Sequence, residues 1–230
     1  LFLLFKEERS SVIKPLAVDS QEGTGSMGDD TALAVMSKMH RQIYDFFRQQ
    51  FAQVTNPPID SLREVAVMTL ETCFGPELNI YEESADHARR LVTTSPVLSH
   101  RKLQSILNNP YFKSEEINLS FDKKSTLKEA IINLQNKVVE IVDSGSSIIH
   151  LVEDLPDQGK LPINALLAVG AVHQKLVKLG KRSDANIIIT SYSARDTHQI
   201  ACLIGFGATA VYPSLAYQTI LDLTTRKELK

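Results

Sequence analysis

The spacing of apolar residues along the chain changes character near residue 113. Before that point, apolar side chains recur three and four positions apart, which is typical of amphipathic helices, and a convincing alternation with period two is missing. Gly75-Pro76 ends one of these patterns. We therefore expect residues 1–112 to be helical and rich in turns. The helices predicted there cover residues 39–54, 61–73 and 83–90, and a short one begins at Ser99.

Beyond residue 113 short apolar runs alternate with longer helical patterns. Four repeats of strand and helix predict parallel strands joined by right-handed crossovers. Half of an eight-stranded barrel and a small open sheet both fit this pattern. The predicted class is α/β, with a helical first half and a parallel-sheet second half, 113–230. The predicted strands are 117–121, 147–152, 186–190 and 208–212, and the predicted helices are 126–143, 162–179, 194–204 and 214–223.

Composition places the chain among ordinary globular proteins, with 43% hydrophobic and 23% charged residues among 230. A formal net charge of −2 gives no basic stripe of the kind that nucleic acid requires. Cys73 and Cys202 stand far apart without a CxxC motif, which favours a reducing compartment over a disulfide or zinc site. The apolar start, residues 1–5, is too short to span a membrane.

Both ends of the chain lack the usual signals of a natural terminus. The first residue is Leu1, and residues 224–230 carry no capping signal. We therefore expect the chain to be a fragment of a longer multidomain polypeptide.

Gly23-Thr24-Gly25-Ser26-Met27-Gly28 matches the spacing GxGxxG of dinucleotide-binding loops. That chemistry needs a preceding strand, but the residues before Gly23 are polar. Asp29 and Asp30, which follow, would place negative charge against a pyrophosphate. The two carboxylates also lack an evident third ligand for magnesium. The segment therefore favours a tight glycine loop, with Asp29 or Asp30 capping a helical turn.

The carboxyl ends of the predicted strands offer few groups for catalysis. Glu153-Asp154 is the best candidate for a general base, and a solvated or capping role is its alternative. Ser191, Ser193, Asp196 and His198 lie close in sequence, but their spacing does not make a nucleophile and a base converge. Ser193 is instead predicted to cap the helix that follows it. His173, in mid-helix, is interpreted as a packed or surface residue. We recognise no active site.

Two consecutive prolines form the most distinctive stretch, Asn56-Pro57-Pro58-Ile59-Asp60, which Arg63 closes. Prolines fix φ and remove two backbone donors, so this segment is predicted to be a rigid corner. Ser61 and Glu64 have the spacing of a capping box at the start of the next helix.

This stretch and several others, in this order, resemble the central domain of the large subunit of glutamate synthase. The resemblance extends from about Lys14 to Leu223 and is strongest over residues 25–37 and 44–63. The later matches are Ser95-Pro96-Val97-Leu98-Ser99, the run from Leu166 to His173, and the run from Ala194 through Gly205-Phe206-Gly207-Ala208.

The resemblance implies a large enzyme that makes L-glutamate from L-glutamine and 2-oxoglutarate. In that family an amidotransferase domain releases ammonia, and an FMN-binding barrel with a [3Fe–4S] cluster uses it. The central domain resembles a rudimentary TIM barrel, joins these two domains, helps to wall the ammonia tunnel and holds no catalytic residue or cofactor. The implied partners are those two domains and a small electron-transfer subunit or ferredoxin, with neither nucleic acid nor membrane. The implied location is the cytoplasm, or the plastid stroma of a photosynthetic eukaryote.

The residues expected at a domain interface or tunnel wall belong to the glycine loop and the proline corner. An internal turn and corner is the alternative interpretation of both segments. The chain departs from the family at residues 190–195, where a Glu-x-Gly-Glu-Ala-Arg-like run is usual. It also departs at residues 152–154, where the end of the preceding strand is usually Ser-Asp-Arg-like. The interface candidates are Ser26, Met27, Gly28, Asp29, Asp30, Asn56, Pro57, Pro58, Ile59, Asp60 and Arg63.

Two other functions compete with this one. The chain could be an independent small α/β enzyme with its site near Glu153 and Asp154, at the strand ends. It could also be an interaction module that docks through Phe46, Phe47 and Phe51.

Overall fold

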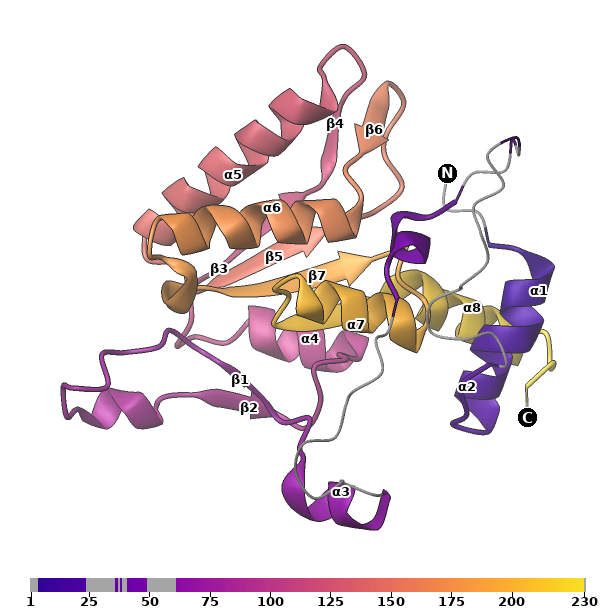
Figure 1. The fold of residues 1–230 in the computed structure, drawn as a ribbon, viewed down its shortest axis with the longest axis horizontal. Coiled ribbons are helices and arrows are strands. Elements are labelled where there is room, and N and C mark those ends of the chain that lie inside the picture. Colours follow the sequence, from indigo (N-terminus) through magenta and orange to yellow (C-terminus); the bar gives the residue numbers. More distant parts are fainter. Residues whose placement is uncertain (1–3, 24–35, 37, 39–40, 49–60, 230) are drawn as a thin grey trace.

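A computed structural model describes residues 4–23, 36, 38, 41–48 and 61–229 (Figure 1). A four-stranded parallel sheet lies at its centre, in the order β3-β5-β7-β8. This arrangement confirms the predicted α/β class, with the parallel strands in the second half of the chain. The sheet strands are β3 (Ser114–Asn118), β5 (Ile148–Val152), β7 (Asn186–Ser191) and β8 (Ala210–Pro213).

Helices connect the sheet strands, and each predicted helix of the second half is present. They are α5 (Leu127–Asp143), α6 (Ala165–Lys178), α7 (Thr197–Gly205) and α8 (Ser214–Thr225). Thr126 caps α5 in a capping box with Glu129. Because the strands run parallel and each crossover is helical, the carboxyl ends of all four strands meet at one edge of the sheet.

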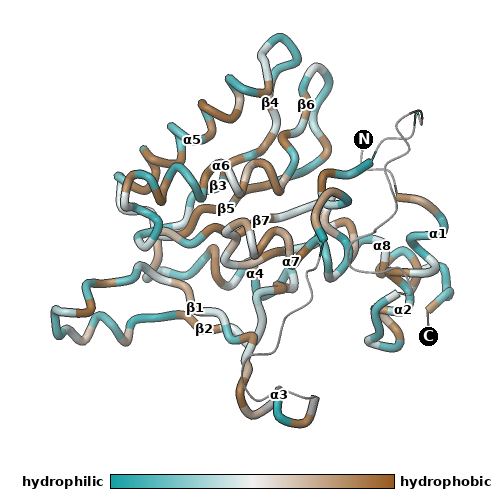
Figure 2. Tube along the Cα trace, viewed as in Figure 1, coloured by the Kyte–Doolittle hydropathy of each residue, from teal (hydrophilic) through white to brown (hydrophobic). Residues whose placement is uncertain are grey.

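Both faces of the sheet are covered. On one face, α5, α6 and α7 pack on Ile149, Leu151 and Ile187 in the larger core. On the other face, α4 (His100–Leu107) and the loop regions around it pack on Ile148 and Ile188. Figure 2 shows β5 and β7 as apolar strands within the molecule, while the turns at its outer margin are hydrophilic. Strands covered on both faces read as continuous apolar runs, which is why they were visible in the sequence.

Within the described part of the first half, two short strands occur that the sequence patterns do not predict. β1 (Thr72–Phe74) pairs antiparallel with β2 (Leu91–Thr93), and Cys73 lies opposite Val92. Three residues are too few for a period-two pattern to be recognised. Phe74 is fully buried in the smaller core, so tertiary packing fixes this pair.

The helices predicted in the first half are shorter than expected. α3 (Ser61–Val67) ends before the predicted limit, and the predicted helix 83–90 is a single 3₁₀ turn, Ala85–Ala88. The predicted helix 39–54 is wrong over 41–48, where one 3₁₀ turn, Ile43–Phe46, is followed by extended Phe47. The rest of that prediction lies outside the described residues. The short helix after Ser99 is confirmed as α4, and Ser99 caps it.

The N-terminal residues form one helical run that the sequence patterns did not define. It comprises α1 (Lys6–Glu8), a π-helical turn (Arg9–Ile13) and α2 (Lys14–Val18), beside α8 in Figure 1. Arg9 Nη2 lies 3.0 Å from Asp222 Oδ2 of α8, and Ile13 is buried. The run is therefore fixed to the last helix of the chain.

Several boundaries in the second half also differ from the predictions. The predicted strand 117–121 divides at Leu119 into β3 and β4 (Ser120–Asp122), and β4 pairs antiparallel with β6 (Lys160–Pro162). Pro162 therefore ends a strand, and Asn164 caps α6 by accepting a hydrogen bond from Leu166 N at 3.0 Å. A 3₁₀ turn, Arg182–Asp184, precedes β7.

The predicted cap of α7 is corrected as well. Asp196, and not Ser193, caps this helix, because Asp196 Oδ1 accepts from Gln199 N at 2.8 Å. A glycine turn follows α7, since Gly207 has a φ of +113° and donates its N–H to Ile204 O at 3.0 Å.

We predict that Gly207→Ala lowers the free energy of unfolding by about 3 kcal/mol. A Cβ at this position would lie 2.3 Å from His173 Nδ1, in addition to the strain of a positive φ. Urea unfolding measures the change. Gly145→Ala is the matched control, because Gly145 has a φ of +86° and nothing within 4 Å of its added Cβ. Equal losses in the two variants would contradict the steric argument.

Candidate functional site

The carboxyl edge of a parallel sheet is where α/β proteins usually bind their ligands. In this chain the edge is occupied by Glu153, which follows β5 and has no exposed surface. Ser191 ends β7, and Tyr192 and Ser193 continue from it. We call the contacting residues Glu153, Ala165 of α6, Ser191, Tyr192 and Ser193 the Glu153 cluster.

The Glu153 carboxylate accepts hydrogen bonds from both sides. Its Oε2 accepts from Ser191 Oγ at 2.7 Å, Tyr192 N at 3.1 Å, Ser193 N at 2.9 Å and Ser193 Oγ at 2.7 Å. Its Oε1 accepts from Ala165 N at 2.9 Å and Ser193 Oγ at 3.0 Å. Every one of these partners can donate, so the arrangement suits an ionised carboxylate.

Tyr44 of the N-terminal half packs against this cluster. Its hydroxyl lies 3.1 Å from Ser193 Oγ, and the whole side chain is buried. Because the single hydroxyl proton of Ser193 goes to Glu153, Tyr44 must donate to Ser193. Burial, and then the charge of Glu153, raises the pKa of Tyr44 well above its ordinary range. The phenol therefore stays protonated and acts as a donor.

Arg195 forms a second link between the N-terminal residues and this edge. Its side chain is 1% exposed and pairs with Glu8 of α1, with Nη2 3.0 Å from Glu8 Oε2. A second contact joins Arg195 Nε to Glu8 Oε1. Removing one partner of such a buried pair leaves an uncompensated charge, which destabilises a protein strongly. The pair therefore fixes α1 to the end of β7.

These contacts decide between the two roles that Glu153 could have. A general base must reach a substrate proton, but Glu153 is enclosed and its oxygens are already occupied by donors. Its bond from Ala165 N satisfies the start of α6, so the capping alternative describes it better. Asp154 is exposed and accepts from Leu155 N at 2.6 Å.

The residues that superficially suggest a hydrolase triad do not converge on one. Ser191 and Ser193 both donate to Glu153. His198 Nε2 lies 3.1 Å from Tyr44 O, the backbone oxygen of another element. Burial raises the pKa of Asp196, which caps α7. These contacts agree with the sequence argument against a triad.

A buried histidine on β5 was not identified from the sequence. His150 is 4% exposed, and its Nδ1 lies 3.1 Å from Glu116 Oε2 of β3 while its Nε2 lies 2.8 Å from Thr190 Oγ1 of β7. Burial lowers the pKa of His150, and the neighbouring Glu116 partly opposes this. The sequence signal that could have identified it is a single histidine within an otherwise apolar strand.

Of the two roles left open for His173, packed or surface, its contacts on α6 favour the first. Its Nδ1 accepts from Arg182 Nε at 3.0 Å, and Arg182 Nη2 also donates to Gly207 O at 2.9 Å. Burial, and then the charge of Arg182, lowers the pKa of His173. The histidine therefore takes part in holding the turn after α7.

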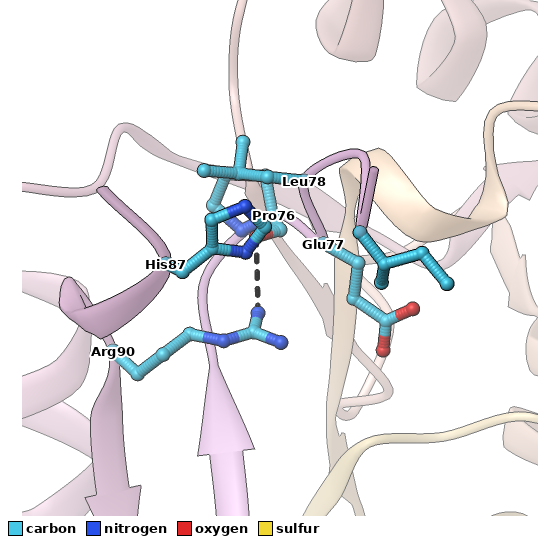
Figure 3. Close-up of a pocket in the computed structure, with 6 residues that line it drawn as sticks. Pro76, Glu77, Leu78, His87 and Arg90 are labelled. Atoms are coloured by element: carbon cyan, nitrogen blue, oxygen red, sulfur yellow. Dashed lines mark hydrogen bonds between the residues drawn. The ribbon is translucent and has the colours of Figure 1, made fainter. Parts of the chain in front are cut away.

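A cavity of about 160 Å³ lies away from the strand ends, beside the loop that joins β1 and β2 (Figure 3). Arg90 crosses it and donates from Nη1 to Gly75 O at 2.7 Å and to Pro76 O at 3.0 Å. Ligand pockets usually measure about 300–1,000 Å³. The cavity is thus too small for a flavin or a nicotinamide cofactor, and its arginine is engaged in holding the turn. Its lining residues are Pro76, Glu77, Leu78, Ile80, His87 and Arg90.

Of the predicted interface residues, only Arg63 lies within the described part of the chain. It belongs to α3 and its side chain is exposed. The glycine-loop candidates Ser26, Met27, Gly28, Asp29 and Asp30 lie outside the described residues, as do the proline-corner candidates Asn56, Pro57, Pro58, Ile59 and Asp60.

Metal ligands and membrane spans were searched for over the described residues. Within them, no three His, Cys, Asp or Glu side chains gather in a way that could hold a metal ion. Over the same ranges, none of the helices combines the length and the apolar character that crossing a bilayer requires.

Comparison with known proteins gives a consistent result. A family model described as the glutamate synthase central domain matches residues 1–230. The chain is 41% identical to ferredoxin-dependent glutamate synthase 2, chloroplastic, of Arabidopsis thaliana over 219 residues, which are 93% of this chain and 13% of the relative. It is 34% identical to glutamate synthase [NADH] of Saccharomyces cerevisiae, over 94% of this chain and 10% of the relative.

A bacterial relative completes the comparison. The chain is 35% identical to the glutamate synthase [NADPH] large chain of Azospirillum brasilense, over 96% of this chain and 15% of the relative. The chain therefore spans about one seventh of the length of that protein, and about an eighth and a tenth of the other two.

We predict that Glu153→Gln lowers the free energy of unfolding by about 3 kcal/mol. The amide NH₂ would face N–H and O–H donors, so either Ala165 N or the group of donors to Oε2 would lose its acceptor. Urea unfolding measures the loss, and Asp154→Asn, at the exposed neighbour, should change stability by less than about 0.5 kcal/mol. An unchanged midpoint in Glu153→Gln would show that the charge contributes little.

We predict that stability falls as the pH drops below about 6.5, in part because of His150. Its pKa is lower in the folded chain than the ordinary 6.5, so the unfolded chain binds the proton more readily. The stabilisation is fully present above pH 6.5 and is lost as the pH falls towards the folded-state pKa.

Urea unfolding between pH 5 and 8 tests this. His150→Asn should flatten the slope, whereas His87→Asn, at an exposed position, should leave it unchanged. A slope that is the same in His150→Asn and the parent would assign the effect to other groups.

Proposed function

Because the chain belongs to the glutamate synthase central domain family, we propose that it is a non-catalytic domain that joins two catalytic domains. The neighbours would be a glutamine amidotransferase domain and an FMN-binding synthase domain of the same polypeptide. The domain would brace them and help to wall the tunnel through which ammonia passes. On this proposal residues 1–230 are one central domain, with a turn-rich part, 1–112, and a βα-repeat part, 113–230.

The non-catalytic assignment rests on the buried side chains that occupy the carboxyl ends of the sheet strands. Parallel sheets bind ligands at this edge, but here buried side chains fill it. Glu153 and Tyr44 both bond to Ser193, and Arg195 pairs with Glu8. A site of this kind has its polar groups satisfied internally and offers no reactive group to a substrate. What it provides instead is rigidity, because it ties β5, β7 and α6 to the N-terminal residues.

The parent protein would make L-glutamate from L-glutamine and 2-oxoglutarate. FMN and a [3Fe–4S] cluster would be bound by its synthase domain and not by these residues. Its electrons would come from ferredoxin, NADH or NADPH, the three donors that the relatives' names print, directly or through a small subunit. We place the protein in the cytoplasm, or in the plastid stroma for a photosynthetic eukaryote, with neither nucleic acid nor membrane as a partner.

The interface with the neighbouring domains would use the glycine loop, the proline corner and Arg63. Arg63 lies on α3 with exposed Leu62 and Val67, and Met68 follows the helix; these three side chains are 88%, 62% and 58% exposed. Exposed apolar side chains gathered in one short segment fit a surface that another domain covers. The interface also accounts for a helix as short as α3, which gains little stability by itself.

The two competing functions have less support. An independent enzyme at Glu153 would need the carboxylate to reach a substrate, and its enclosure prevents that. A docking module would need three phenylalanines at the surface, but Phe47 packs on the larger core. The centroid of its ring lies 5.0 Å from that of Phe206. Phe46 is 57% exposed, and Phe51 lies outside the described residues.

We predict that Arg63→Ala in the full-length parent protein uncouples glutamine hydrolysis from glutamate synthesis. Loss of an interface contact would let ammonia escape, so less glutamate forms for each glutamine hydrolysed. Synthesis from added ammonia should stay unchanged, because the flavin domain is untouched. Glutamate and free ammonia are measured together over the time course.

The control is Arg101→Ala, at an exposed arginine of α4. It should leave the ratio of glutamate formed to glutamine consumed unchanged. If Arg63→Ala also keeps the parent ratio, Arg63 is not part of the interface. Stoichiometric FMN bound to residues 1–230 alone would contradict the non-catalytic assignment itself.

A further inference from the structure

We propose that the donors around Glu153 form an anion-binding site for a small carboxylate, whose occupant is the chain's own side chain. When that side chain is shortened, free formate or acetate should enter the site. This inference rests on the contacts of the Glu153 cluster and does not depend on the proposed tunnel role. At the usual ligand-binding edge of the sheet, the chain itself then supplies the ligand.

The donors come from chain segments other than the one that carries Glu153. Ala165 N belongs to the first turn of α6, a helix of 14 residues whose N-terminus favours negative charge. Tyr192 N and Ser193 N are consecutive amides after β7 that point at the same oxygen, Oε2. Two backbone segments thus converge on one carboxylate, as they do in sites that bind free anions.

The hydroxyl donors have partners of their own, apart from Glu153. Ser191 Oγ accepts from Ala194 N at 3.0 Å, and Ser193 Oγ lies 3.1 Å from the buried Tyr44 hydroxyl. Ser214 Oγ donates to Ser191 O at 3.2 Å. These bonds keep the donors oriented towards the centre when the carboxylate is removed, so the site is preorganised.

The burial of the site determines which anions it accepts. Glu153 has no exposed surface, so a replacement must fit the space that the side chain vacates. Glu153→Ala removes the carboxylate and one methylene but leaves Cβ. The former Cδ position lies only about 2.5 Å from Cβ, two bonds away. Formate therefore enters with its carbon displaced by about 1 Å from that position, where it reaches the contact of about 3.5–4 Å with Cβ.

Acetate is too long for the alanine variant, since its methyl carbon would take the place of a bonded Cγ. In Glu153→Gly its methyl carbon, near the former Cγ position about 2.5 Å from Cα, needs the same displacement of about 1 Å as formate in Glu153→Ala. Acetate should therefore be excluded from the alanine variant and admitted by the glycine variant, whereas formate should enter both. A tetrahedral anion such as sulfate should be excluded from both, because the donors are arranged for two oxygens in one plane.

The test is thermal unfolding of the full chain in increasing sodium formate, acetate, sulfate or chloride. For Glu153→Ala we expect the midpoint to rise by about 3–6 °C for every tenfold increase in formate above its dissociation constant. Chloride reports the effect of ionic strength, and sulfate reports general stabilisation by excluded salts. The parent chain should show only these general shifts, because its own carboxylate already fills the site.

Two further variants separate anion binding from other effects. Asp154→Ala loses a carboxylate of the same segment without vacating the site, so formate should act on it as on the parent. Adding Ser193→Ala to Glu153→Ala removes a hydroxyl donor and should weaken the formate response about tenfold in concentration. An equal formate response in the parent, Asp154→Ala and Glu153→Ala would overturn the proposal.

The test remains decisive if Glu153→Ala does not fold in plain buffer. Near-ultraviolet circular dichroism and a cooperative transition should then appear on adding formate and not on adding chloride. Failure of formate to restore folding to Glu153→Ala, together with failure of acetate to restore Glu153→Gly, would contradict the proposal.

Discussion

The enclosed carboxylate of Glu153 is the interaction on which the rest of the site depends. An ionised carboxylate taken out of water loses a large hydration energy, and it is stable only when donors replace that hydration. The donors here are three backbone amides and two hydroxyls from α6 and the end of β7. The requirement to satisfy one charge therefore sets the relative positions of two loops and a helix, and through Tyr44 it reaches the N-terminal half.

The need to satisfy the Glu153 charge also decides how the carboxyl edge of the sheet is used. A parallel sheet concentrates helix N-termini and loop amides at its carboxyl edge, which is why ligands bind there in so many α/β proteins. In this chain those groups are used to hold the chain together. The Arg195–Glu8 pair adds a second charge contact at the same edge, and both contacts join the N-terminal residues to the sheet. An edge with this structure is rigid, which the proposed bracing role requires.

The sequence predicts those elements that are determined by local patterns of apolar residues. It does not predict elements that are determined by contacts between residues far apart in the chain. α5 and α6 were predicted because their apolar faces repeat over three turns or more, and β5 and β7 because they are buried on both faces. The β1–β2 pair was missed because three residues carry no readable period, and Phe74 is held by contacts with the smaller core. Aromatic residues at helical spacing predict a helix at Tyr44, but the same spacing fits a 3₁₀ turn whose tyrosine enters the core.

Glu153 shows the same limit at the level of a single side chain. The sequence placed a carboxylate at a strand end, which fits a base, a solvated group and a cap equally well. Only the approach of Ala165, Tyr192 and Ser193 decides among them, and these residues lie 12, 39 and 40 positions away. Contacts over such separations follow from the fold and not from local pattern. Because the deciding donors are backbone amides, whose chemistry does not vary with the residue, inspection of side-chain types alone could not have assigned the role.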